Sequence, residues 1–273
     1  MKNKFYQNKV ALITGASSGI GRAVAVELAH VGVKVVLGDQ QAEGLAKVAD
    51  QIKTQGGEAI PCVMDVTEES QCQKLIDTAI DQYGRLDIVV CCAGISMRAN
   101  FDEVRLEVLH RLMNVNFWGT VYCAKYALPH LIAAKGSFVG ISSVAGIHGL
   151  PGRTGYSASK FALTGFLETI RIENLKNNLH VMITIPGFTA TNIRYAALTA
   201  DGSEQGYTPR NESKMMSAER VAQHIRCGIR RKKRYLFLGI EGKLVSLIKK
   251  ITTSLLDRFF YIAMTKEPHS PLK

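Results

Sequence analysis

The chain contains 273 residues, of which 47% are hydrophobic and 21% charged, with 34 Lys and Arg against 23 Asp and Glu. These proportions are typical of a globular protein and exclude a disordered, collagen-like or coiled-coil chain. The net charge is +11, but most of the excess lies after residue 200 and no nucleic-acid-binding motif accompanies it. We therefore expect no nucleic-acid partner.

The six cysteines form no CxxC pair and no cluster spaced like metal ligands. Most lie in apolar runs, so we expect reduced, buried thiols, no metal and a cytoplasmic location. The N-terminal segment lacks the apolar core of a secretory signal. No run of about 18 apolar residues predicts a membrane-spanning helix.

Short apolar runs alternate with helical patterns along most of the chain. The predicted strands are residues 9–14, 33–37, 58–63, 86–91, 136–142, 180–185 and 234–238. The predicted helices are residues 20–31, 42–54, 67–83, 106–134, 155–177 and 217–231. Strands that are apolar on both faces, separated by helices, indicate parallel strands buried between two helical layers.

This alternation predicts an α/β fold, with a single doubly wound parallel sheet of about seven strands and helices on both faces. We predict one Rossmann-like, dinucleotide-binding and catalytic domain over residues 1–240. Residues 241–273 then form a C-terminal amphipathic helix and tail.

A glycine-rich loop, TGASSGIG at 14–21, lies between the first predicted strand and helix. Glycines here let the backbone turn tightly and approach a pyrophosphate, and the N-terminus of the following helix favours that anion. An ordinary glycine turn is the alternative, but the strand-to-helix position favours a cofactor site. We expect the cofactor to contact Gly15, Ser17, Ser18, Gly19, Ile20 and Gly21.

Asp39 follows the second predicted strand at about the spacing of a ribose-binding carboxylate. A carboxylate there accepts hydrogen bonds from both ribose hydroxyls and repels a 2′-phosphate, which favours NAD. Arg22 could reach a phosphate, so NADP stays possible. The alternative is that Asp39 is a solvated carboxylate in a turn, with no role in cofactor binding.

The third and fourth predicted strands also end on candidate cofactor contacts. Asp65 and Val66 end the third, where an Asp could meet the adenine amino group. Ala93 and Gly94 follow the fourth, where small residues let the backbone approach the cofactor. The alternative for each pair is that the residues only end a strand and bind no cofactor.

A second set of residues points to proton transfer. Tyr156 and Lys160 share one helix face at i, i+4 spacing. A tyrosine pKa of about 10 is too high for a base at neutral pH, and a lysine cation lowers it. Ser143, at a strand end, could hold a substrate oxygen, and Asn116 could tether a water that relays protons to Lys160. A YxxxK pattern by itself usually lies on a solvated helix face. The inference therefore depends on its occurrence together with the glycine loop and with Ser143 at a strand end.

These residues together resemble the short-chain dehydrogenase/reductase family over roughly residues 9–238. The resemblance rests on the loop at 14–21, on Asp65 and Val66, and on a tetrad that matches Asn116, Ser143, Tyr156 and Lys160. It implies that Pro186, Gly187 and Thr191 form a loop over the nicotinamide amide.

The family chemistry implies hydride transfer between nicotinamide C4 and a carbinol or carbonyl carbon, with Tyr156 as acid/base and Lys160 also binding the ribose. Members are commonly dimers or tetramers, so we expect a homo-oligomer. One position departs from the family pattern: Cys92 stands where an Asn usually braces the central sheet.

The loops beyond the strand ends predict a mostly apolar substrate wall. Its candidates are Ile95, Met97, Phe101, Val144, Ile147, Leu150, Phe188, Ile193, Tyr195 and Leu198. We therefore predict an NAD-dependent oxidoreductase acting on a hydrophobic secondary alcohol or ketone of steroid, retinoid or lipid type. Arg98, His148 and Arg194 could instead select an anionic group. The alternatives are an NADPH-dependent carbonyl reductase and a dinucleotide-binding sensor or scaffold without turnover.

Residues 244–263 predict one helix with an apolar face near several lysines and arginines. Such a helix could lie on a membrane surface, although packing on its own domain or on a partner subunit is more common. The basic run at 230–234 reads as a solvated helix end, with attraction to anionic lipid as the second interpretation.

Overall fold

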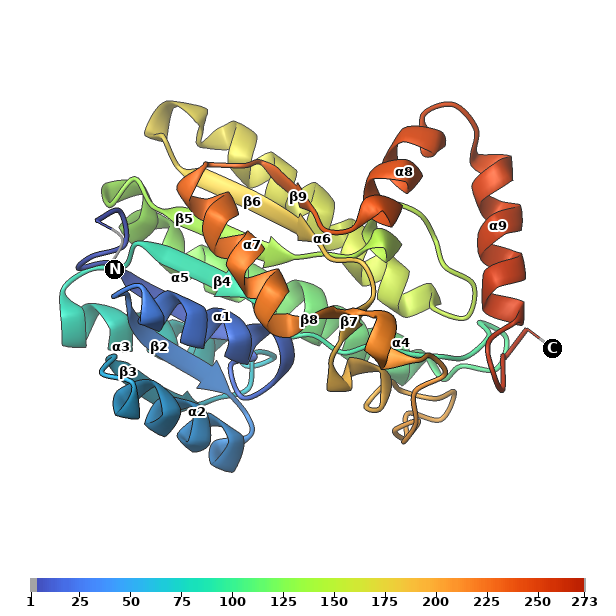
Figure 1. Cartoon of the computed structure of the whole chain (residues 1–273), viewed down its shortest axis with the longest axis horizontal. Coiled ribbons are helices and arrows are strands. Elements are labelled where there is room, and N and C mark those ends of the chain that lie inside the picture. Colours follow the sequence, from blue (N-terminus) through green and yellow to red (C-terminus); the bar gives the residue numbers. More distant parts are fainter. Residues whose placement is uncertain (1–3, 273) are drawn as a thin grey trace.

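The computed structural model describes residues 4–272, except for the side chains at 214, 240 and 241. The chain forms a parallel seven-stranded sheet between two layers of helices (Figure 1). The strand order is β3-β2-β1-β4-β5-β6-β9, and every neighbouring pair is parallel. The strands are β1 (Val10–Thr14), β2 (Lys34–Asp39), β3 (Ala59–Val63), β4 (Ile88–Cys91), β5 (Ser137–Ile141), β6 (His180–Ile185) and β9 (Tyr235–Phe237). The predicted doubly wound α/β fold is confirmed.

Two apolar cores lie on opposite faces of the sheet, because successive strand side chains point to opposite faces. In β1, Ala11 and Ile13 belong to one core, while Val10 and Leu12 belong to the other. All four are almost completely buried. Double burial explains why the strands read as continuous apolar runs.

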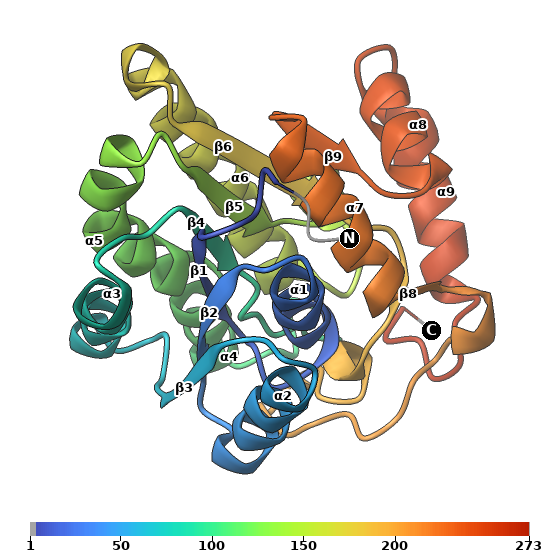
Figure 2. The ribbon, with the colours of Figure 1, turned by 60° about the vertical axis from the view of Figure 1, so that its left-hand side comes forward.

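The helices divide between these two faces (Figure 2). One face is covered by α1 (Gly19–His30), α2 (Ala42–Thr54) and α7 (Ala218–Arg230). The other is covered by α3 (Glu69–Tyr83), α5 (Gly119–Ala133) and α6 (Thr154–Glu173). The helix predicted from residue 67 begins at Glu69, because the backbone N–H and hydroxyl of Thr67 both donate to the Asp65 carboxylate at 2.9 Å.

The long helix predicted over 106–134 is interrupted. It consists of α4 (Leu106–Met113), a π-helical turn at Asn114–Trp118 and α5. The Asn116 side chain in this wider turn points toward the loop after β4. There it forms two hydrogen bonds with the backbone of Ile95. Single π-turns often mark functional positions.

A buried carboxylate links the amino ends of the two neighbouring central strands β1 and β4. Asp87, which precedes β4, accepts hydrogen bonds from Val10 N at 3.0 Å and from Arg85 at 2.7 and 2.8 Å, and it pairs with Lys9 at 3.3 Å. Burial alone raises the pKa of Asp87, but Arg85, Val10 N and Lys9 outweigh it and hold that pKa below its usual value.

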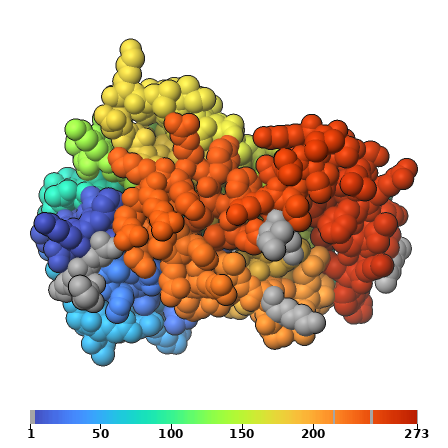
Figure 3. Space-filling model, turned by 45° about the horizontal axis from the view of Figure 1, so that its top comes forward, coloured from blue at the N-terminus to red at the C-terminus, as the bar shows by residue number. Residues whose placement is uncertain are grey.

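The prediction of one C-terminal helix over 244–263 is wrong. The structure has α8 (Ile240–Lys249) and α9 (Thr253–Thr265), which form a hairpin (Figure 1). The last part of the chain lies at one end of the molecule (Figure 3). The backbone N–H groups of Ile251 and Thr252 both bond to the Ile248 carbonyl, which closes α8. The turn lets residues of both helices form one small core, made of Val245, Leu256, Phe260 and Met264.

A short pair of parallel strands, β7 (Thr189–Ala190) and β8 (Met216–Ser217), closes the loop region between β6 and α7. No helix in the part of the chain that the structure describes is long and apolar enough to cross a bilayer.

Candidate active site

A cavity of about 790 Å³ lies beyond the carboxyl ends of the central strands. It spans the point where the order of the strands reverses, between β1 and β4, which is where open α/β sheets bind ligands. Every predicted cofactor residue lines it: Gly15, Ser17, Ser18, Gly19, Ile20, Gly21, Asp39, Asp65, Val66, Ala93, Gly94, Tyr156, Lys160, Pro186, Gly187 and Thr191. Ser143 also lines the cavity, whereas Asn116 lies behind its wall.

The glycine loop is shaped for a group that approaches its backbone closely. Gly15 has a φ of +66°, and a Cβ there would lie 2.7 Å from Ala93 N. A Cβ on Gly21 would lie 2.0 Å from the Gly15 carbonyl oxygen. Ser18 caps α1 without a side-chain hydrogen bond, so the first amides of the helix are open to an anion. The loop therefore fits the pyrophosphate of a dinucleotide.

Asp39 lies at the end of β2 with its carboxylate beside this loop. One oxygen accepts the Ser17 N–H and the other the Gln41 N–H, each at 3.0 Å. Arg22 does not line the cavity, and its guanidinium lies 3.5 Å from Gln51 Oε1.

Ser143, Tyr156 and Lys160 line one wall of the cavity. Ser143 follows β5 and accepts the Ala145 N–H at 3.2 Å. Lys160 Nζ donates to the Ile141 carbonyl oxygen at 2.9 Å and lies 5.7 Å from the centre of the Tyr156 ring. These contacts hold the ammonium group beneath the phenol.

Burial is the largest influence on the pKa values of Tyr156 and Lys160. Burial raises the pKa of Tyr156, while hydrogen bonding to Ser143 and the positive charge of Arg153 lower it. Burial also lowers the pKa of Lys160 to about 8, with Cys91 and Cys92 acting in the opposite direction. Arg153 is thus a second cation beside the phenol, in addition to the Lys160 ammonium 5.7 Å from the ring centre.

Asn116 connects the π-turn to two parts of the site. Its Oδ1 accepts the Ile95 N–H at 2.8 Å, and its Nδ2 donates to Ile95 O at 3.0 Å and Ser159 Oγ at 2.9 Å. A Cβ on Gly94 would lie 3.1 Å from Asn116 Oδ1 and 3.5 Å from Lys160 Nζ. The side chain thereby fixes the loop after β4 against α6, close to Lys160.

Cys92 takes the place of the asparagine that the family resemblance leads one to expect. Burial raises the pKa of its thiol to about 12, so the side chain is a neutral apolar group. The Thr14 hydroxyl bridges the strands at this point, by accepting the Ala93 N–H at 3.3 Å.

Sequence reasoning missed Arg153, Arg210, Met264 and Glu267, all of which line the cavity. Arg153 had a signal, because it directly precedes α6 and lies only three residues before Tyr156 in the sequence. Glu267 had none, because it lies far from the other site residues along the chain. Several expected wall residues lie elsewhere: Met97 is fully buried and Phe101 points to solvent.

The anionic-group candidates of the sequence are mostly engaged with carboxylates. Arg194 pairs with Glu212 at 2.6 Å, and His148 lies 3.1 Å from Asp257. Among the side chains that the structure describes, no group of three or more His, Cys, Asp and Glu is placed to hold a metal ion.

Comparison with known proteins matches residues 9–201 to the short chain dehydrogenase family model. The chain is 34% identical over 262 residues, covering 94% of this chain and 83% of the relative, to the Arabidopsis thaliana protein named 11-beta-hydroxysteroid dehydrogenase-like 2.

Two solved structures have the same architecture. One is the alcohol dehydrogenase of the archaeon Thermococcus sibiricus complexed with 5-hydroxy-NADP, with a TM-score of 0.74, 26% identity and coverage of 84% of this chain and 95% of that one. The other is a short chain dehydrogenase/reductase of Burkholderia phymatum in complex with NAD, with a TM-score of 0.82 and coverage of 92% and 96%. At 24% identity this second likeness shows the fold alone.

The fold and the site thus define a dinucleotide-dependent oxidoreductase. The chain belongs to the short-chain dehydrogenase/reductase family, whose members use NAD(P) and act on CH–OH groups.

Proposed function

We propose that this protein transfers a hydride between NAD(H) and a secondary alcohol or carbonyl of a hydrophobic substrate. The observation that carries the proposal is the sharing of one cavity by the glycine loop and by Ser143, Tyr156 and Lys160. The loop end holds the dinucleotide, and the Tyr156 end holds the reacting oxygen.

The bound nicotinamide supplies hydride acceptance or donation at C4. In oxidation, Tyr156 accepts the proton of the substrate hydroxyl as the hydride leaves the carbinol carbon, and in reduction it returns that proton to the carbonyl oxygen. Ser143 donates to this oxygen and orients it. Burial favours the protonated phenol that reduction needs, while Ser143 and Arg153 favour the tyrosinate that oxidation needs. Lys160 binds the ribose and holds its charge below the phenol, and Asn116 supports a water relay toward Lys160.

A preference for NAD is supported by Asp39, whose carboxylate lines the cavity beside the glycine loop. It is also supported by Arg22, which lies outside the cavity lining with its guanidinium beside Gln51. A 2′-phosphate beside that carboxylate would be repelled. Calorimetric titration with NADH and NADPH tests this preference, with Asp39→Ala as the variant and Asp50→Ala, an exposed aspartate of α2, as the matched control. Tighter NADPH binding by the wild type would overturn it.

An apolar substrate is supported by the apolar part of the cavity lining. The apolar side chains that line it are Ile95, Leu150, Phe188, Ile193, Leu198 and Met264. The likeness to a protein named for hydroxysteroid dehydrogenase activity points in the same direction. A panel of secondary alcohols and ketones of steroid, retinoid and lipid type, with small polyols as the comparison set, measures this preference.

Tyr156→Phe tests the catalytic assignment, because it removes one oxygen atom from the site. We expect loss of turnover and unchanged NADH binding, measured as ligand-dependent thermal stabilisation. Retained turnover would contradict the proton-transfer role. Cofactor binding without turnover of any substrate by the wild type would favour the sensor or scaffold alternative.

A second proposal concerns a membrane surface. The α8–α9 hairpin exposes a row of large apolar side chains: Leu244, Leu247, Ile251, Leu255, Phe259 and Ile262. Exposed cations flank them at Lys243, Lys250, Arg258 and Lys266. Apolar groups with a basic rim are suited to the interface of an anionic bilayer.

Flotation with anionic vesicles tests this contact. We expect the wild type to float and an Ile251→Ser, Phe259→Ser variant to remain in solution. Val63→Ser, which changes an exposed apolar residue of β3 outside the hairpin, serves as the control. Equal flotation of all three proteins would remove the membrane proposal.

A homodimer or homotetramer is a further proposal. It is supported by large apolar side chains exposed on or beside the long helices, at Trp118, Phe161, Ile172 and Leu175. Light scattering after size-exclusion chromatography measures the assembly. A cytoplasmic location is supported by cysteines that are all free.

A further inference from the structure

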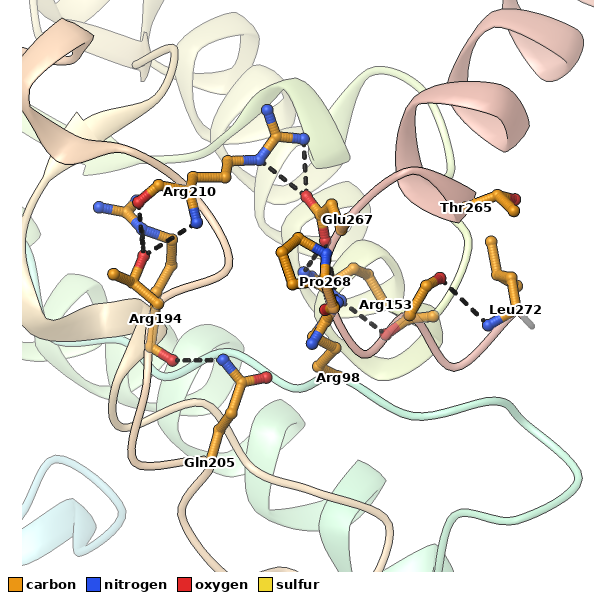
Figure 4. A network of polar contacts seen from close by, with 12 residues as sticks. Arg98, Arg153, Arg194, Gln205, Arg210, Thr265, Glu267, Pro268 and Leu272 are labelled. Carbon is orange, nitrogen blue, oxygen red and sulfur yellow. Dashed lines mark hydrogen bonds and ion pairs between the residues drawn. The ribbon is translucent and has the colours of Figure 1, made fainter.

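Four charged side chains from separate segments meet at the substrate end of the cavity (Figure 4). Arg98 comes from the loop after β4, Arg153 caps α6, Arg210 lies in the loop before β8, and Glu267 follows α9. Arg210 Nε and Nη2 each lie 2.7 Å from Glu267 Oε1. Arg98 Nη2 and Arg153 Nη2 lie 3.5 and 3.6 Å from Glu267 Oε2.

This cluster is short of negative charge. Three guanidinium groups surround one carboxylate, and no other carboxylate among the side chains that the structure describes forms an ion pair with any of them. The side chains of Arg98, Arg153, Arg210 and Glu267 are 3%, 15%, 25% and 6% exposed. Burying unmatched charge is unfavourable unless partners compensate for the lost water.

The remaining hydrogen bonds do not supply that charge. Arg98 donates to the Tyr207 hydroxyl at 2.8 Å and to the Pro268 carbonyl at 2.6 Å, both neutral, and its buried Nε has no partner. Burial and the neighbouring arginines lower the pKa of Arg153 to about 10, which still leaves it charged at neutral pH. A second anion at this place would therefore be stabilised by charge that the protein already holds.

The cluster faces the reacting end of the cavity. Arg153, Arg210 and Glu267 line the same space as Tyr156, and Arg153 lies one helical turn before Tyr156. Apolar residues such as Met264 line the space between. A ligand with an apolar body and an acid group would contact both kinds of wall at once.

We propose that Arg153 and Arg210 bind the carboxylate of an amphipathic substrate, so that this enzyme acts on hydrophobic hydroxy or oxo acids. The proposal deepens the oxidoreductase function proposed above and rests on it for the reaction. Glu267 marks the position that a carboxylate takes between the arginines. It competes with the substrate acid, so removing its charge strengthens acid binding. Arginine suits this role because its planar fork binds carboxylates in a bidentate manner.

Calorimetric titration with decanoate and decanamide, in the presence of saturating NADH, tests the proposal. The two probes share the alkyl chain length and differ in charge. We expect the wild type to bind decanoate roughly tenfold more tightly than decanamide, as one charged hydrogen bond provides. Arg210→Gln should abolish that difference, Glu267→Gln should enlarge it, and Arg220→Gln, an exposed arginine of α7, should leave it unchanged.

Equal binding of the two probes by the wild type would overturn the proposal, as would an undiminished preference in Arg210→Gln. If Glu267→Gln fails to fold, the comparison of Arg210→Gln with Arg220→Gln decides the question. Turnover of neutral ketones, measured on the same samples, separates the two proposals. Turnover without acid preference overturns only the acid site, and acid preference without any turnover overturns only the reaction.

Discussion

Replacing Lys160 with methionine should abolish turnover and yet stabilise the cofactor-free protein at neutral pH. Lys160 is 5% exposed, and burial lowers its pKa from 10.5 to about 8. Each pKa unit corresponds to about 1.4 kcal/mol, so holding the charged form in this site costs roughly 3 kcal/mol. Methionine loses the hydrogen bond to Ile141 O, worth about 1 kcal/mol. The net expected stabilisation is about 2 kcal/mol.

The pH dependence has a definite sign. Between about pH 8 and pH 10.5 the unfolded chain holds the Lys160 proton and the folded chain does not, so wild-type stability rises with pH across that window. The stability of the methionine variant does not depend on this titration. Its advantage is therefore complete below about pH 8 and disappears as the pH approaches 10.5.

Urea unfolding of the cofactor-free proteins, followed by circular dichroism at about pH 7 and about pH 10, measures both effects. Lys176→Met, which changes an exposed lysine near the end of α6, is the matched control. A Lys160→Met protein less stable than the wild type near neutral pH would refute the reasoning. An advantage that does not change with pH would refute the titration argument.

Three further predictions concern the glycine loop, the buried Asp87 carboxylate and the Cys92 thiol. Gly21→Ala places a Cβ 2.0 Å from the Gly15 carbonyl oxygen, so calorimetry should detect no NADH binding although the circular dichroism spectrum stays that of the wild type. Asp87→Asn should lower the unfolding free energy by about 3 kcal/mol near neutral pH. Because the Asp87 pKa is depressed by folding, that difference should shrink as acid protonates the wild-type carboxylate, and a constant difference in acid would contradict the assignment. The Cys92 thiol, with its pKa raised to about 12, should resist iodoacetamide in the native protein and react after unfolding, as read by peptide mass spectrometry.

The sheet and the glycine loop were predictable because their signals are local. The residues of β1 alternate between two apolar cores, and the loop at 14–21 follows directly in sequence. Tyr156 and Lys160 also share one helix, so their spacing alone places them on one face.

The remaining features depend on contacts between distant segments. The π-turn around Asn116 is stabilised by hydrogen bonds to Ile95 and Ser159, which no helical periodicity records. The hairpin of α8 and α9 depends on packing between the two helices rather than on the apolar stripe that predicted one helix. Arg98 meets the Pro268 carbonyl across 170 residues of chain, so the charged cluster has no sequence signature.

The groups that influence the pKa values of Tyr156 and Lys160 could also be identified only from the structure. The helix spacing of Tyr156 and Lys160 is consistent with a lysine that lowers the phenol pKa. In the structure the Lys160 ammonium bonds to the Ile141 carbonyl, and Arg153, which the sequence analysis did not single out, also lowers the phenol pKa. Burial depends on the whole fold, and it is the largest influence on the pKa values of both Tyr156 and Lys160.

The most direct test of the central claim follows the hydride itself. A hydrophobic secondary alcohol that carries deuterium at the carbinol carbon is incubated with NAD and the enzyme, and the reduced cofactor is examined by mass spectrometry and NMR. The account predicts deuterium at nicotinamide C4 with the wild type and none with Tyr156→Phe, although both proteins bind the cofactor. Cofactor bound by the wild type without transfer of deuterium from any secondary alcohol, or equal transfer by Tyr156→Phe, would contradict it.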